Sequence, residues 1–82
     1  MAITDREREI KQLRHDAQMA RSVLGETIRR IRVTIGKDSF IVDVWRGRVC
    51  GVTGPHSEYL GMDETEAATE LRATGASFAD VS

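Results

Sequence analysis

The hydrophobic positions in the first third of the chain repeat with the period of a helix. They fall seven residues apart with further apolar positions between them: Ile3, Ile10, Leu13, Ala17, Ala20 and Leu24. A stripe this narrow is typical of a helix that packs along one seam. Thr4 can cap its start, because Glu7 stands three residues later as in a capping box, and Gly25 can end it. The pattern predicts a helix over about residues 5–24.

From residue 28 onward the period becomes that of a β-strand. Arginines and β-branched residues alternate first, and two further short apolar runs follow. We expect Lys37-Asp38 and Arg46-Gly47 to form the two-residue turns between them, since Gly47 can adopt a positive φ. The sequence therefore predicts a three-stranded antiparallel meander, with strands at about 28–35, 39–45 and 48–53.

The two faces of this meander differ in character. With Lys37-Asp38 as the first turn, the apolar face pairs Ile35 with Phe40, Val33 with Val42, and Ile31 with Val44. On the second face Arg30 then lies opposite Trp45, and the second turn sets Arg48 on the other side of the same ring. In this register Trp45 is expected between two arginines.

A second helix is expected near the C-terminus. Asp63 can cap its start and Glu66 places negative charge in its first turn, where the helix dipole favours it. Gly75 marks its end, which gives a helix over about residues 64–74. Its apolar face is thin, and Phe78 and Val81 are expected to anchor the tail. The fold class is therefore α+β, with residues 1–82 as a single small domain in the order α-β-β-β-α.

Composition and charge narrow the function classes. A formal net charge of −1, from 12 basic and 13 acidic residues, provides no bulk attraction to nucleic acid or to a membrane surface. A single cysteine, Cys50, excludes an intrachain disulfide and a cysteine-built zinc site. The charged N-terminal segment lacks the apolar run of a signal peptide or membrane span, so a cytoplasmic location is expected.

The candidate reactive residues do not form a catalytic pattern. His15 and His56 have no second metal ligand at helical spacing, and His56, Ser57 and Glu58 are only neighbours in sequence. Cys50 is expected beside Asp43, whose charge disfavours a thiolate. We therefore predict no enzyme activity, no catalytic residues, no metal site and no cofactor.

The second face of the sheet carries more apolar area than a solvated face usually does. Ile41 and Val52 are expected to share it with Trp45, so something should cover it. The cover could be the N-terminal helix or a second copy of the chain. The second copy is favoured, with Ile41, Val52, Leu13 and Leu24 as the self-association residues.

These observations favour a small, non-enzymatic, self-associating binding module that occupies a surface of a protein partner. Tryptophan and arginine most often dominate the energy of such contacts. The expected contact residues are Arg30, Arg32, Trp45, Arg46 and Arg48. Short, motif-free chains of this kind are typical of accessory or inhibitor proteins of phages and mobile elements.

Two alternatives remain open from the sequence. The same arginines could bind nucleic acid with Trp45 stacked on a base, or an oligomer could enclose a small anionic ligand between subunits.

The element order is similar to that of double-stranded RNA-binding domains, whose second helix is expected to begin with lysines that bind phosphate. Here that position reads DETE, which would repel phosphate.

Overall fold

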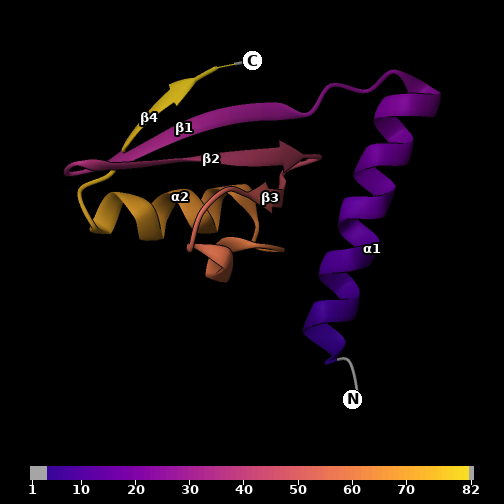
Figure 1. The fold of residues 1–82 in the computed structure, drawn as a ribbon, viewed down its shortest axis with the longest axis horizontal. Coiled ribbons are helices and arrows are strands. Elements are labelled where there is room, and N and C mark those ends of the chain that lie inside the picture. The colour runs from indigo at the N-terminus through magenta and orange to yellow at the C-terminus, as the bar shows by residue number, and fades with distance from the viewer. Residues whose placement is uncertain (1–3, 82) are drawn as a thin grey trace.

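A four-stranded antiparallel sheet is the centre of the structure, a computed structural model that describes residues 4–81 (Figure 1). Its strands lie in the order β3-β2-β1-β4. In chain order the elements are α1 (Asp5–Met19), a π-helical segment (Ala20–Leu24), β1 (Arg29–Ile35), β2 (Asp38–Trp45), β3 (Arg48–Val52), a 3₁₀ turn (Ser57–Tyr59), α2 (Glu64–Ala73) and β4 (Ser77–Asp80). The α+β class is thus confirmed, with one strand more than the sequence predicts.

The additional strand is β4, which pairs with β1 and places Phe78 opposite Val33. All four of its residues are exposed. From the sequence only an anchored tail is expected here, because four residues are too few to display a strand period. This strand forms because it pairs with β1, so the pattern of its own four residues does not predict it.

The residues that cap the helices are those predicted from the sequence. The Thr4 hydroxyl accepts a hydrogen bond from the amide of Glu7 at 3.1 Å, and the Asp63 carboxylate accepts one from the amide of Thr65 at 3.0 Å. Gly25 ends the first helix in the left-handed conformation, with φ 70°. Ile3, the first residue of the apolar stripe, lies outside the described residues.

The first hairpin has a different register from the predicted one. Gly36 and Lys37 form the turn, so Ile35 pairs with Asp38 and Val33 pairs with Phe40. The reason is the backbone: Gly36 has φ 59°, and the first central position of a type II′ turn favours glycine. The shift is two residues, so each side chain keeps its predicted face while every cross-strand pair changes.

The second hairpin turns at Arg46-Gly47 as predicted, with Trp45 opposite Arg48 and Val44 opposite Val49. Beyond these pairs a β-bulge between Asp43 and Val44 shifts the register. The extra residue puts Val52 opposite Val42 instead of Ile41. Because side chains alternate along a strand, a shift of one residue moves Val52 to the opposite face of the sheet.

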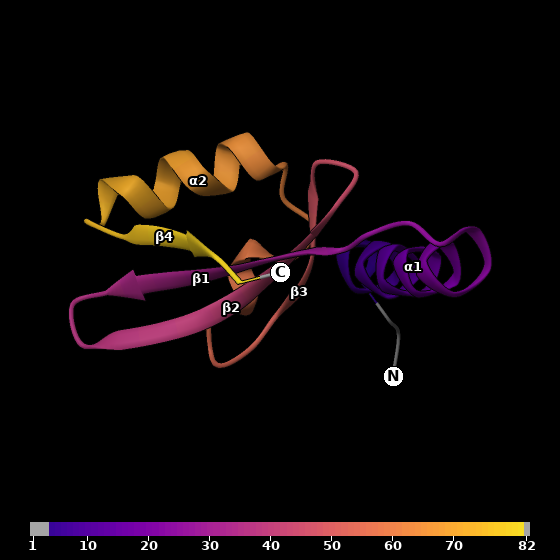
Figure 2. The ribbon, with the colours of Figure 1, turned by 90° about the horizontal axis from the view of Figure 1, so that it is seen from above.

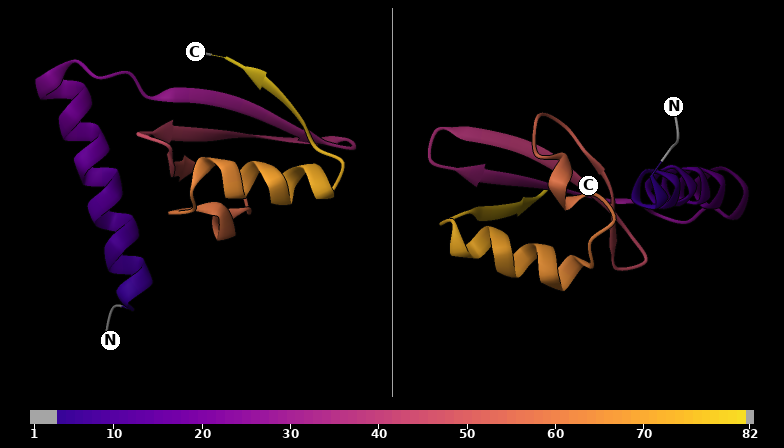
Figure 3. Two further views of the ribbon diagram at one scale, coloured as in Figure 1. Left: turned by 180° about the vertical axis from the view of Figure 1, so that it is seen from behind. Right: turned by 90° about the horizontal axis from the view of Figure 1, so that it is seen from below.

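The two helices occupy different places relative to the sheet. Figures 1 and 2 show α2 along one face, while α1 stands across the end of the strands and is seen end-on from above. The views from behind and from below show the same arrangement (Figure 3). In residues 4–81, no helix lies over the greater part of the second sheet face.

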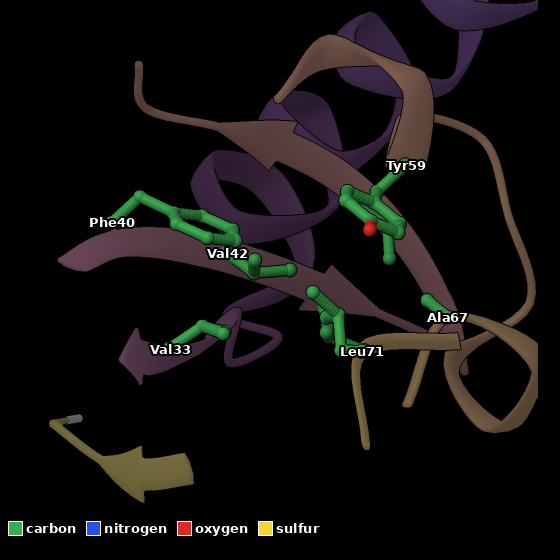
Figure 4. Close-up of a cluster of buried hydrophobic side chains, with 8 residues drawn as sticks. Val33, Phe40, Val42, Tyr59, Ala67 and Leu71 are labelled. Carbon is green, nitrogen blue, oxygen red and sulfur yellow. The ribbon is translucent and has the colours of Figure 1, made fainter. Parts of the chain in front are cut away.

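The apolar core is divided accordingly into two clusters. The larger lies between α2 and the sheet, where Leu71 of α2 points toward Val42 of β2 (Figure 4). Its buried members are Val33, Phe40, Val42, Val44, Val49, Tyr59, Ala67 and Leu71. The smaller cluster joins α1 to the ends of β2 and β3 through Leu13, Ala17, Ala20, Trp45 and Cys50.

Candidate functional site

Trp45 belongs to the core, which corrects the prediction of an exposed ring between Arg30 and Arg48. Only 9% of the residue is exposed, and it packs with Leu13 and Ala17 of α1. Arg30 pairs with Asp43 instead of Trp45, because the first hairpin turns one residue earlier than predicted and its register therefore shifts by two. A ring buried in this way cannot stack on a nucleic-acid base in this conformation.

Most of the predicted contact arginines have partners within the chain. Arg30 forms an ion pair with Asp43 at 3.2 Å. Arg48 donates from Nη2 to the carbonyl oxygen of Gly61 at 2.9 Å, and so holds the segment before α2 against β3. Arg32 is exposed on the open sheet face, opposite Ile41 on one side and Ala79 on the other. The structure therefore does not gather these side chains into one arginine surface.

Arg46 is the one arginine of the set that lies against Trp45. Its Cζ is 4.6 Å from the ring centroid, and its guanidinium donates to both carboxylate oxygens of Glu26. The hydrogen bond and charge of Glu26 raise the pKa of Arg46. A positive φ of 51° at Arg46, together with Gly47 at 76°, makes the tight turn that puts the guanidinium there.

The four predicted self-association residues separate in the structure. Leu13 is buried against Trp45, and Val52 packs on the α2 side of the sheet because of the bulge. Ile41 stays on the open face and is half-buried. Leu24 is exposed, since the wider turn of the π-helical segment rotates it away from the seam that Leu13 and Ala17 follow.

The candidate reactive groups are engaged in packing. Burial, and then the charge of Asp43, raises the pKa of the Cys50 thiol, whose Sγ donates to the Asp43 carbonyl oxygen at 3.4 Å. The ring of His56 stacks on Phe40 with a centroid separation of 4.3 Å. His56 is thus half-buried. No group of three or more metal-ligating side chains occurs within residues 4–81.

Where α1 ends, three of the predicted contact residues, Leu24, Trp45 and Arg46, form one surface with Met19 and Val23, which were not predicted. Met19 is 49% exposed, and Val23 and Leu24 are each 68% exposed. Together with Trp45 and Arg46 they line a shallow hollow of about 400 Å³. We call these five residues the helix-end surface. In the sequence, Val23 widens the apolar stripe of the first helix. That additional apolar residue was the signal that could have indicated this surface.

Comparison with known proteins adds no assignment to this geometry. The chain matches no protein-family model, no curated protein and no solved structure. Within residues 4–81 there is also no helix whose length and apolar content would allow it to cross a bilayer. The function must therefore be inferred from the surface itself.

Proposed function

We propose that the protein is a non-enzymatic binding module that docks an apolar segment of a partner protein on the helix-end surface. The observation that carries this proposal is the exposure of Met19, Val23 and Leu24 side by side around one hollow. Scattered exposed apolar residues are normal, whereas a contiguous group beside a hollow is typical of an interaction site.

The chemistry of the hollow fits a protein contact. Trp45 forms its base and the guanidinium of Arg46 covers part of the ring, so the apolar centre is bordered by a charged group. Interfaces commonly combine an aromatic or arginine anchor with a surrounding polar rim. Asp16 lines the same hollow and supplies the opposite charge.

The backbone also marks this surface. Val23 and Leu24 lie on a π-helical segment, which turns both side chains away from the α1 seam toward solvent. Short π-helical insertions occur frequently at functional sites. If Leu24 continued the α-helical stripe, it would lie over the smaller cluster, and the surface would lose one of its three apolar residues.

The first experiment is site-specific photo-cross-linking in the cells that produce the protein. A photoreactive phenylalanine analogue replaces Val23, and a control replaces Lys37, an exposed residue of the first hairpin turn at the far end of β1. We expect a protein adduct from position 23 alone. An adduct with a second copy would identify self-association, and an adduct with another chain would identify a different partner.

Two variants of the same segment test the contact itself. The double variant Val23→Asp with Leu24→Asp puts charge into the apolar surface, while Ser22→Asp puts charge on a neighbouring exposed position of the same segment. Binding of the cross-linked partner should fall at least about tenfold in the first variant and stay unchanged in the second. No adduct at position 23, or equal loss in both variants, would overturn the proposal.

A further inference from the structure

A second hollow lies between α2 and the sheet, away from the helix-end surface. It is a cavity of about 190 Å³, lined mainly by apolar side chains. The cause is side-chain size: α2 presents Ala67 and Ala68 to the sheet, and the sheet presents Val33, Val42 and Val44. Because the side chains of α2 and of the sheet are short here, they do not fill the space between the two elements.

This hollow is partly open to solvent, unlike an enclosed void in the core. Interiors are close-packed, with few voids larger than a water molecule. Apolar cavities of roughly 150 Å³ stay dry and accept compact apolar molecules such as benzene. The α2 cavity therefore has room for one aromatic ring or a chain of about six carbons.

The rim of the cavity carries charge at both ends of α2. At the start of the helix, Arg29 forms an ion pair with Glu64 at 2.7 Å. Toward its end, the guanidinium of Arg72 lies 5.6 Å from the centroid of the Phe78 ring. Arg72 has no carboxylate partner among residues 4–81, so one end of the cavity offers an uncompensated positive charge.

Phe78 gives this charged end an opening. It lies on β4, the edge strand, and is 37% exposed while it also lines the cavity. A ring at the sheet edge can move without displacing a buried neighbour on its outer side. A ligand can therefore reach the apolar interior past Phe78 while a polar end stays near Arg72.

We propose that the α2 cavity binds a small carboxylate with a compact apolar body. The hydrocarbon part contacts the alanines of α2 and the valines of the sheet, and the carboxylate pairs with Arg72. Arginine suits this role because its planar guanidinium can donate two parallel hydrogen bonds to one carboxylate. Because Arg29 is already paired with Glu64, the carboxylate of the ligand binds at the Arg72 end of the cavity.

The test uses hexanoate as the probe and hexanol as its neutral analogue of equal chain length. Methyl NMR signals of Val33, Val42 and Leu71 report on the cavity during a titration of the full chain. We expect saturable shifts with hexanoate at about tenfold lower concentration than with hexanol, a ratio typical of one hydrogen bond to a charged group. Absence of saturable shifts, or equal affinity for both probes, would overturn the proposal.

Two pairs of variants locate the ligand. Ala68→Leu fills the cavity, and Ala73→Leu adds the same volume at an exposed position of α2. The first should abolish the hexanoate shifts and the second should retain them.

Arg72→Gln should lower hexanoate affinity to that of hexanol, while Arg14→Gln on exposed α1 should leave it unchanged. Arg72 is exposed, so its variant keeps the test decisive if Ala68→Leu fails to fold. Wild-type binding in Arg72→Gln would contradict the proposal.

Discussion

Arg46 and Trp45 are consecutive residues whose side chains meet, with the guanidinium carbon 4.6 Å from the centroid of the indole ring. The same guanidinium donates to Glu26 in the connection between α1 and β1, at 3.1 Å and 2.8 Å. Arg46 therefore ties the end of the first helix to the second hairpin, on the solvent side of the buried Trp45. This contact adds to the packing of Leu13 and Ala17 on Trp45 and to the hydrogen bond from Arg6 to the Glu58 carbonyl oxygen, which also hold α1.

The first prediction concerns the size of the Trp45 side chain. Trp45→Ala should lower the free energy of unfolding by about 3–5 kcal/mol, because it empties the centre of the smaller cluster. Trp45→Phe should cost less. The buried indole Nε1 has no hydrogen-bond partner among the described residues, so removal of this nitrogen breaks no hydrogen bond. Urea unfolding followed by circular dichroism measures both. Equal losses would contradict this account.

A second prediction addresses the attachment of α1. Ala17 is 1% exposed, so Ala17→Asp would bury a charge against Trp45 and should detach the helix. Fluorescence of the chain's single tryptophan should shift to longer wavelength as water reaches the ring. Gln18→Asp, at the next and exposed position, is the control and should leave the emission unchanged. An unshifted spectrum in Ala17→Asp would mean that α1 does not cover Trp45.

The β-bulge yields a third prediction. A Cβ placed on Gly51 would lie 2.9 Å from Oδ2 of Asp43, whose other oxygen binds Arg30. Gly51→Ala should therefore displace that carboxylate from Arg30 and destabilise the fold by at most about 1 kcal/mol, the usual upper value of an exposed ion pair. In an Asp43→Ala background the cost should largely disappear, which a double-mutant cycle of unfolding free energies measures. If the losses of unfolding free energy in Gly51→Ala and Asp43→Ala simply add in the double variant, the proposed clash is wrong.

The fourth prediction concerns alkaline pH. Burial, followed by the charge of Asp43, raises the pKa of Cys50, so the folded state favours the protonated thiol. Its contribution to stability is complete below the unfolded thiol pKa of about 8.5 and is lost as the pH rises through the higher folded value. The free energy of unfolding should fall more steeply above pH 8.5 in the wild type than in Cys50→Ala.

This comparison isolates the thiol, because Tyr59, whose pKa burial also raises, is present in both proteins. Parallel pH profiles of the two proteins would show that Cys50 keeps its ordinary pKa on folding.

The sequence by itself determined the elements whose signals are local. Thr4 and Gly25 bound the first helix because capping and positive φ are properties of a few consecutive residues. For the same reason Asp63 starts α2, and Arg46-Gly47 makes the second turn. Local pattern also placed each β1 and β2 side chain on the correct face, since a register shift of two residues preserves the alternation.

Only the tertiary structure decided the pairs beyond the bulge, the pairing of β4 and what covers each face of the sheet. The bulge beside Val44 and the pairing of β4 depend on contacts between strands that the local pattern does not specify, whereas the first hairpin takes its register from the local turn at Gly36. The covering of Trp45 by α1 likewise depends on where the helix lies, and a helical stripe does not encode that position. The helix-end surface and the α2 cavity follow from these non-local choices, so the pattern of residues alone could not reveal them.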